Sequence, residues 1–351
     1  MAQEFDSTTA GGPFLRSGEG RWSREGEGRL MPLKFMPIVT TFSVTSSRLP
    51  LEKCLNDPDL LSAAFLDYRE RVGLECFPIM WDSHFTAEAF GCTLGFTERE
   101  AVVQHPLAFP SGGEVNSFYV PEINASPRVQ CMLEAVKKVS RCASESPVIA
   151  NTTAPFTAAT KIFGVENLLI KLYDEPDQVK LVLRKIADFI KAYSDQLVES
   201  GATVLFVGEP MGSPEIISPL MFREFVFPEL KRIVSFSRAP SILHICGNVY
   251  PILREMVDIG ADLLSVDQRV ELKRVREIVG WEVLLGGNLD PVEVLLKGTP
   301  ETVTQAARRC YQEAGPQRFV LMPGCTILPE TPVENIRAMI QVTREWSNED
   351  A

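Results

Sequence analysis

The stretch Ser241-Ile-Leu-His-Ile-Cys-Gly-Asn248 begins as an apolar run and ends with His244 and Cys246. A short apolar run of this kind predicts a buried β-strand. In an extended strand, residues i and i+2 point to the same side, so the imidazole of His244 and the thiol of Cys246 can converge on one point. Zinc prefers such nitrogen and sulfur ligands. A third candidate ligand, Cys325, ends another apolar run much later in the chain.

Short apolar runs recur through the chain, and most alternate with amphipathic segments that predict helices. The predicted strands are 35–42, 74–80, 147–151, 203–207, 241–244, 262–266, 282–286 and 319–322. The predicted helices are 51–72, 127–142, 158–172, 175–199, 222–236, 249–259, 272–279, 300–314 and 331–346. Continuous apolar runs fit strands that are buried on both faces. The alternation therefore predicts an α/β fold, the (β/α)8 or TIM barrel.

Two segments depart from this alternation. Residues 1–30 combine several glycines with Arg, Glu and Ser and contain few apolar residues. Such a composition cannot bury a core, so we predict a disordered N-terminal tail followed by one barrel domain over residues 31–351. Residues 85–130 are rich in Pro and Gly. There we predict an irregular excursion after the second strand, with one turn of helix at most around Ala87–Phe90.

The overall composition bounds the function. The 351 residues carry a net charge of −11, which argues against binding to nucleic acids or to anionic membranes. No apolar run approaches the roughly 18 residues of a membrane span. The eight cysteines occur without a secretory signal sequence, in a chain too long to need a disulfide framework. They therefore predict reduced thiols and a cytoplasmic location.

Polar and thiol side chains gather where the predicted strands end. They are Asp82, Glu209, His244, Cys246, Asp267, Asn288, Asp290 and Cys325. Barrel enzymes build their active sites at the carboxyl ends of the strands. Cysteines and histidines scattered through a core would not all be expected there. We therefore predict that His244, Cys246 and Cys325 bind a zinc ion and leave its fourth position for substrate.

Two carboxylates are candidate catalytic residues beside this metal. Asp267 is expected to occupy the fourth metal position until substrate displaces it, and a hydrogen-bonding or helix-capping carboxylate is the alternative. Glu209 is expected to accept a hydrogen bond from His244 and so to orient the imidazole. The alternative for Glu209 is an ordinary loop charge.

The remaining strand-end residues are candidates for binding a cofactor. Asp82 is expected to line the pocket mouth, and Asn288 is the second candidate. Asn288 and Asp290 also stand in the sequence Asn-Leu-Asp-Pro, which is a good turn sequence. Holding the loop after the seventh strand is therefore the alternative role for both.

These segments resemble the uroporphyrinogen decarboxylase superfamily over residues from about 34 to 346. The resemblance is carried by Ala154-Pro-Phe-Thr157, by Ile259-Gly-Ala-Asp262 with Ser265-Val-Asp267, and by Gly286-Gly-Asn-Leu-Asp-Pro291. Within the superfamily the chain looks most similar to the methylcobamide:coenzyme M methyltransferase branch, which Ala87-Glu-Ala-Phe-Gly91 also resembles. In that branch His-x-Cys and a distant Cys bind zinc. Cobalamin-independent methionine synthases have a similar arrangement, completed by a Glu, and Asp267 stands at a similar spacing.

One departure from the superfamily concerns its decarboxylases. Those enzymes open with a Trp-x-Met-Arg-Gln-Ala-Gly-Arg-Tyr-like segment, whose arginines meet the carboxylates of the porphyrinogen. This chain has Met36-Pro-Ile-Val-Thr-Thr-Phe42 there and has no Arg between Leu33 and Ser47. A substrate with many carboxylates would lack those charge partners.

The resemblance implies a zinc-dependent methyltransferase. It implies that a methyl group moves from a methylated corrinoid, carried by a separate corrinoid protein, to a small thiol such as coenzyme M. Tetrahydrofolate is another possible acceptor. Two other functions stay open at this point: a decarboxylase acting on a tetrapyrrole, and a non-catalytic barrel that binds zinc.

Deletion of residues 1–30 is expected to leave the melting temperature of the protein nearly unchanged, because a segment without a core contributes few contacts. Differential scanning calorimetry of the full and shortened chains would measure this. A marked drop in melting temperature would instead show that the tail docks on the barrel.

Overall fold

The computed structural model describes residues 14–16, 22–24, 33–39, 42–46, 49–80, 83–315 and 317–349. Within the predicted tail it describes only β1 (Phe14–Arg16) and β2 (Trp22–Arg24), which pair antiparallel. The rest of that tail lies outside the described residues, so its disorder stays a prediction. Asp82 lies outside them as well.

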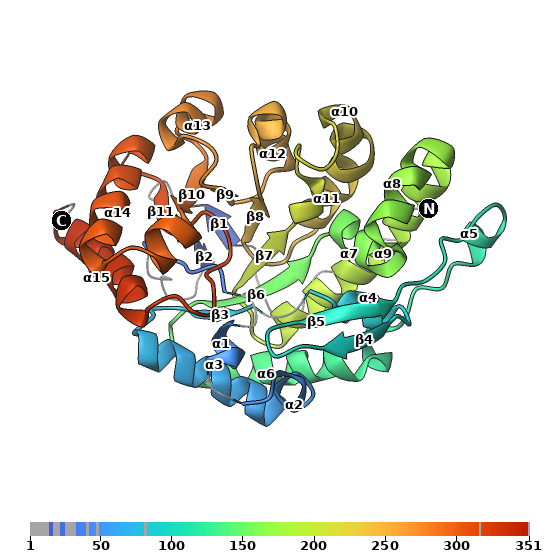
Figure 1. Ribbon diagram of the computed structural model, residues 1–351, viewed down its shortest axis with the longest axis horizontal. Coiled ribbons are helices and arrows are strands. Elements are labelled where there is room, and N and C mark those ends of the chain that lie inside the picture. The colour runs from blue at the N-terminus through green and yellow to red at the C-terminus, as the bar shows by residue number, and fades with distance from the viewer. Residues whose placement is uncertain are drawn as a thin grey trace, which may run out of the picture.

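A curved parallel sheet forms the centre of the molecule (Figure 1). Its seven strands lie side by side in the order in which they follow one another along the chain. They are β3 (Phe77–Ile79), β6 (Val148–Thr153), β7 (Val204–Gly208), β8 (Ser241–Ile245), β9 (Leu263–Val266), β10 (Leu284–Leu289) and β11 (Phe319–Pro323). The segment 33–39 takes the eighth position, because Phe35 bridges Leu321 in parallel and the Met36 amide donates to the Leu321 carbonyl at 3.0 Å. The predicted TIM-barrel architecture is confirmed, although the first strand is reduced to this bridge.

Helices surround the sheet and follow the strands (Figure 1). The longer ones are α3 (Pro58–Val72), α6 (Pro127–Cys142), α7 (Pro155–Phe163), α8 (Val165–Asp174), α9 (Pro176–Glu199), α11 (Phe227–Ser235), α12 (Leu253–Ile259), α13 (Leu272–Val279), α14 (Pro300–Ala314) and α15 (Val333–Glu349). The predicted helix 51–72 is divided into α2 (Leu51–Leu55) and α3, because the Asp57 carboxylate accepts hydrogen bonds from the Asp59 and Leu60 amides and starts a new helix. None of the described helices has the length and apolar character needed to cross a bilayer.

The excursion after β3 is more regular than predicted. It contains α4 (Phe85–Ala89) and an antiparallel hairpin of β4 (Thr93–Phe96) and β5 (Ala101–His105). Partly exposed residues dominate both hairpin strands, so the sequence shows no clear alternation. The fully buried Arg128 stabilises the base of this hairpin. It forms an ion pair with Glu88 at 3.2 Å, and its guanidinium lies over the Phe96 ring. At the tip, Arg99 pairs with Glu330 in the loop after β11 at 2.5 Å.

The interior of the barrel is filled by side chains that alternate along the strands, as the period of two requires. These interior residues include Ile149, Val204, Phe206, Ile242, Leu263, Leu284, Val320 and Met322. Gly286 belongs to the same level, and a Cβ there would lie 2.4 Å from the Met322 Sδ atom and 2.8 Å from a Leu263 methyl carbon. Its lack of a side chain therefore leaves room for Met322. His244 lies two residues after Ile242, so it points to the same interior side at the carboxyl end.

A buried arginine braces the amino ends of β10 and β11. Arg276 of α13 donates to the carbonyls of Ala314, Gly280, Val283 and Arg318, at 2.9, 3.0, 2.7 and 3.0 Å. The side chain is only 4% exposed. The guanidinium therefore provides hydrogen bonds to four carbonyls and joins α13 to the segments that precede β10 and β11.

We expect Arg276→Ala to lower the free energy of unfolding by about 3 kcal/mol, because it strands buried carbonyls without donors. The midpoint of urea unfolding would measure the loss. Arg309→Ala is the matched control, since that side chain is 71% exposed and should change stability by less than about 0.5 kcal/mol. Equal midpoints for the two variants would contradict the bracing role.

Candidate metal centre

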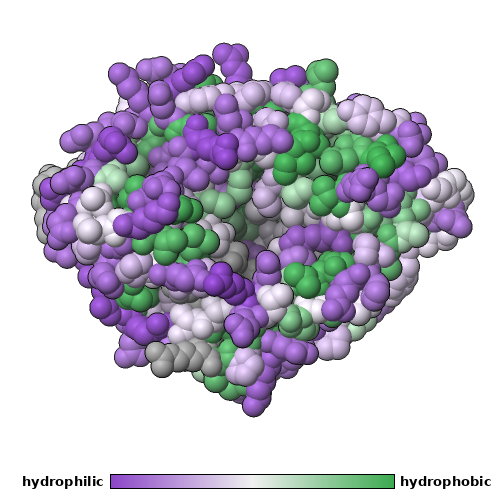
Figure 2. Space-filling model, in the orientation of Figure 1, coloured by the Kyte–Doolittle hydropathy of each residue, from purple (hydrophilic) through white to green (hydrophobic). Residues whose placement is uncertain are grey.

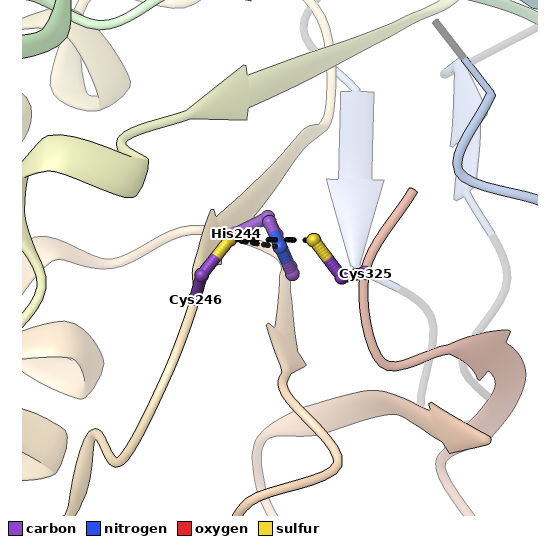
Figure 3. Close-up of side chains that lie close together, drawn as sticks. All are labelled: His244, Cys246 and Cys325. Carbon is purple, nitrogen blue, oxygen red and sulfur yellow. Dashed lines mark hydrogen bonds between the residues drawn. The ribbon is translucent and has the colours of Figure 1, made fainter. Parts of the chain in front are cut away.

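Two segments bring the three predicted metal ligands together. His244 is the penultimate residue of β8, Cys246 follows that strand, and Cys325 lies in the loop after β11. Figure 3 shows the imidazole and the two sulfur atoms turned toward one another. The Nε2 atom of His244 lies 3.2 Å from the Cys246 sulfur, which lies 3.6 Å from the Cys325 sulfur. The three donor atoms all lie within 4.8 Å of one another.

These separations fit a tetrahedral zinc ion. With zinc–sulfur bonds near 2.3 Å and zinc–nitrogen bonds near 2.0–2.1 Å, the edges of the tetrahedron are about 3.8 Å between sulfurs and about 3.6 Å between sulfur and nitrogen. The donor set of two sulfurs and one nitrogen also matches the preference of zinc over harder cations. Three protein ligands leave one position open, as in catalytic zinc sites.

A serine fixes the orientation of the imidazole. Ser265 of β9 is in register with His244 of β8, and its hydroxyl lies 2.9 Å from the Nδ1 atom of the ring. Both side chains are buried, and Phe206 of β7 stacks on the ring at 5.9 Å between centroids. The hydrogen bond at Nδ1 leaves Nε2 directed at the sulfurs, where a metal would bind.

The two thiols are electrostatically coupled. Because a hydrogen bond joins Cys246 to the Cys325 sulfur, the pKa of Cys325 is lowered and that of Cys246 is raised, with burial adding to the rise. Cys325 is therefore the more acidic sulfur of the pair. A thiolate is the form that binds a metal.

Asp267 takes the hydrogen-bonding role and not the predicted place at the metal. It is 4% exposed, and its two oxygens accept hydrogen bonds from the backbone amides of Gly247 and Arg269, each at 2.9 Å. It is not among the residues grouped with His244 and the two cysteines. Both oxygens are engaged by backbone amides, so the carboxylate instead fixes the turn directly after Cys246.

Glu209 does not contact the His244 imidazole, so the predicted orienting role is wrong. Its fully buried carboxylate accepts hydrogen bonds from the amides of Phe156 and Thr157, at 3.0 and 2.8 Å, and from the Thr157 hydroxyl. Burial raises the pKa of Glu209 to about 7, against the opposing effect of the Thr157 hydrogen bonds. The residue before α7 is Ala154, which has no capping side chain. Glu209 directly follows β7, and from there its carboxylate accepts hydrogen bonds from the free backbone amides at the start of α7.

Asn288 and Asp290 hold loops, which was the alternative for both. The Asn288 side-chain amide donates to the carbonyls of Asp267 and Val270 at 3.0 and 2.7 Å. The Asp290 carboxylate accepts from the amides of Val292 and Glu293, each at 2.8 Å. Neither residue lines the pocket that contains the candidate ligands. Both residues line a second pocket instead, so the cofactor-binding role of Asn288 stays a prediction.

The candidate ligands open into a pocket at the carboxyl end of the barrel. It has about 680 Å³ of empty space, counting the part open to solvent, and Figure 2 shows a hollow near the centre of this face. Its described lining residues are Ile38, Met80, Ser83, Asn151, Thr152, Thr153, Thr157, Phe206, Gly208, Pro210, His244, Cys246, Cys325 and Thr326. None of these is a Lys, Arg, Asp or Glu. The volume suits a small molecule.

Sequence reasoning missed several of these side chains. Ser265 and the lining residues Ser83, Asn151 and Thr153 lie at or just beyond the ends of strands β9, β3 and β6. The strand-end rule that singled out the metal ligands would have included them. Hydroxyl side chains are common in turns, so their position alone does not mark a site.

The fold and the site together define a barrel enzyme with a His–Cys–Cys centre at the carboxyl ends of its strands. The sequence model of the uroporphyrinogen decarboxylase (URO-D) family matches residues 38–346. The chain belongs to that family, as its resemblance predicted.

Two relatives and one solved structure narrow the class. Methylcobamide:CoM methyltransferase MtbA of Methanosarcina acetivorans is 31% identical over 282 residues, which cover 78% of this chain and 81% of the relative. A uroporphyrinogen decarboxylase of Aromatoleum aromaticum is 28% identical over 313 residues, covering 85% of each chain. A methyltransferase structure from Methanosarcina mazei superposes with a TM-score of 0.81 at 26% identity, covering 90% of this chain and 95% of the other. The similarity to these methyltransferases confirms the prediction of an enzyme of the methyltransferase class.

We expect Ser265→Ala to weaken zinc binding by about 10- to 100-fold, because the imidazole loses the hydrogen bond that orients it. Competition with a chromogenic chelator would measure the affinity. Ser194→Ala is the control, since that serine is also buried but donates to a carbonyl of its own helix, α9. Equal affinities in the two variants would exclude the orienting role of Ser265.

Proposed function

We propose that this chain is a zinc-dependent methyltransferase that moves a methyl group from a methylated corrinoid to a small thiol. The observation that supports it best is the convergence of His244, Cys246 and Cys325 at the floor of the barrel pocket. Bound there, zinc would act as a Lewis acid that favours the thiolate form of the acceptor. The relatives named for methylcobamide and coenzyme M support the same donor and acceptor classes.

The reaction balances as a displacement at carbon. The acceptor thiol releases its proton to solvent, and its sulfur attacks the methyl carbon. The carbon–sulfur bond forms as the cobalt–carbon bond breaks, and cobalt keeps the electron pair, passing from Co(III) to Co(I). The walls of the pocket hold the thiol in line with the methyl group and limit access of water.

We propose that a separate corrinoid protein presents the methyl group at the barrel mouth. A pocket of about 680 Å³ suits the small thiol, whereas a corrinoid is much bulkier. We also propose a cytoplasmic location. All eight cysteines are described and are free thiols, which suits a reducing compartment.

A tetrapyrrole decarboxylase is the second candidate, since a decarboxylase is among the relatives. Its substrate carries many carboxylates, which need several basic partners. The described pocket lining contains no Arg or Lys, and the sequence has no Arg between Leu33 and Ser47. Methyl transfer is therefore the better proposal. Formation of coproporphyrinogen from uroporphyrinogen at enzymatic rates would overturn it.

A non-catalytic barrel that binds zinc is the third candidate, and an activity measurement separates it from the other two. Zinc-loaded protein should convert methylcobalamin and a small thiol to a demethylated corrinoid and a methyl thioether. Free methylcobalamin lacks the docking contacts that a corrinoid protein would make, so a slow rate is sufficient.

We expect Cys325→Ala to lower the turnover of that reaction by at least about 100-fold, because removing a ligand disrupts the open metal site. Absorbance of the corrinoid would give the rate, and elemental analysis should find about one zinc per chain in the parent protein. Cys310→Ala is the matched control, since that buried cysteine lies on α14, outside the ligand group. Equal turnover of chelated and zinc-loaded protein would exclude the zinc-dependent mechanism.

A further inference from the structure

The two cysteines of the candidate metal centre lie on separate segments, although their sulfurs are only 3.6 Å apart (Figure 3). Cys246 follows β8 and Cys325 follows β11, and two further strands, β9 and β10, lie between them in the sheet. In a flat sheet, three steps of about 4.8 Å would separate those strands. The curvature of the barrel and contacts beyond the strand ends therefore determine the distance between the sulfurs.

One turn reaches the segment that carries the first cysteine. This turn, Asp267–Val270, connects β9 to α13, and the Val270 amide donates to the Asp267 carbonyl across it at 3.3 Å. The Asp267 carboxylate accepts a hydrogen bond at 2.9 Å from the amide of Gly247, the residue directly after Cys246. The position of Cys246 is therefore tied to the β9 turn.

The same turn also contacts the segment that carries the second cysteine. Gln268 packs against Gly324, the residue directly before Cys325, so closely that a Cβ on Gly324 would lie 2.5 Å from the Gln268 amide nitrogen. On its other side, the Gly324 amide donates to the Leu289 carbonyl at 2.7 Å. Among the described residues the buried Gln268 Oε1 atom has no hydrogen-bond partner, so this contact depends on packing. The Cys325 segment can therefore neither approach the turn nor move away from it without losing a contact.

Asn288 of β10 fixes the turn from below. Its side-chain amide donates to the carbonyls of Asp267 and Val270, which are the first and last residues of the turn, at 3.0 and 2.7 Å. The Asn288 Oδ1 atom accepts from the Cys310 thiol at 3.7 Å. Both ends of the amide group are engaged, so its orientation is defined and the turn is tied to β10 as well as to its own strand.

We propose that the Asp267–Val270 turn is a spacer that sets the distance between the Cys246 and Cys325 sulfurs, with Asn288 and Gln268 as its positioning residues. The inference rests on the proposed function in so far as those sulfurs bind zinc. Two sulfurs bound to a tetrahedral zinc ion lie about 3.8 Å apart, so a spacer that holds them near this distance favours metal binding.

We expect Asn288→Ala to weaken zinc binding by about tenfold or more, because the turn loses both hydrogen bonds to β10. Competition with a chromogenic chelator gives the affinity. The visible bands of the cobalt(II)-substituted protein report the geometry of the site and should lose intensity. Asn335→Ala is the matched control, since Asn335 also donates to two loop carbonyls, those of Leu295 and Gly298, at 2.8 and 2.9 Å. It should lower stability but leave the zinc affinity and the cobalt spectrum as in the parent protein.

Gln268 provides a second test that does not depend on the folding of the Asn288 variant. Gln268→Ala should weaken zinc binding and change the cobalt spectrum in the same direction, because the bulk that packs against Gly324 is lost. Gln268→Met keeps a side chain of similar length and should retain most of the affinity of the parent protein. Gln178→Ala is the control, since Gln178 accepts from the Gly112 amide at 3.0 Å at the start of α9, outside the turn.

Phenylarsine oxide measures the distance between the sulfurs without a metal ion. It reacts with two thiols, releases one water and joins both sulfurs to one arsenic atom, so its affinity depends on their spacing. The metal-free Cys325→Ala protein gives the background from the other cysteines. We expect Asn288→Ala and Gln268→Ala to lower the affinity of this reagent by about tenfold, and Asn335→Ala and Gln178→Ala to leave it unchanged.

The outcomes separate the spacer from the proposed function. If the parent protein binds no zinc while the arsenical affinity still depends on Asn288 and Gln268, the spacer is supported and the zinc-dependent reaction is overturned. If zinc affinity, cobalt spectrum and arsenical affinity are unchanged in both Asn288→Ala and Gln268→Ala, the spacer is overturned. Equal losses in the two control variants would overturn it as well, because the effect would then follow from stability alone.

Discussion

The close approach of two sulfurs and one imidazole is the constraint on which the carboxyl end of this barrel depends. Three donor atoms within 4.8 Å of one another keep that arrangement only where the surrounding residues fix the side chains. The registered pairing of β8 with β9 provides that support, because it sets the Ser265 hydroxyl against the His244 ring. A shift of one residue in either strand would turn one of the two side chains to the opposite face. The geometry of the candidate metal centre thus depends on strand register as much as on the identity of the ligands.

Buried carboxylates stabilise the segments that carry the site. Asp267 accepts from the amide that follows Cys246, and Glu209 accepts from the first amides of α7. In each case a side chain at the end of one strand satisfies backbone donors in a neighbouring segment. Both carboxylates are therefore occupied by backbone amides and are structural residues. Acidic residues near a metal are therefore weak indicators of catalysis unless their hydrogen bonds are known.

Residue patterns predicted the fold and the candidate metal ligands, which the structure brings together. Strand and helix periodicity carried most of that prediction. The predicted bounds of helices α6, α13 and α14 match the structure. Ser126 and Thr299 precede the starts of α6 and α14, and Gly280 follows the end of α13. His244 and Cys246 follow from the period of two in a strand. The partner of His244 could not be predicted, because it depends on which residue of β9 lies opposite. The hairpin of β4 and β5 was missed because its strands are half exposed and carry no alternating pattern.

The hairpin is held with unequal strength at its two ends. At its base, the Arg128 guanidinium is almost completely shielded from water, and parting it from Glu88 would strand a buried charge. At its tip, Arg99 and Glu330 are 70% and 47% exposed, so their attraction contributes at most about 1 kcal/mol and weakens in salt. Glu330 belongs to the same loop as Cys325. A rise in ionic strength should therefore weaken the contact between the hairpin tip and the loop that carries Cys325, while the buried base stays intact.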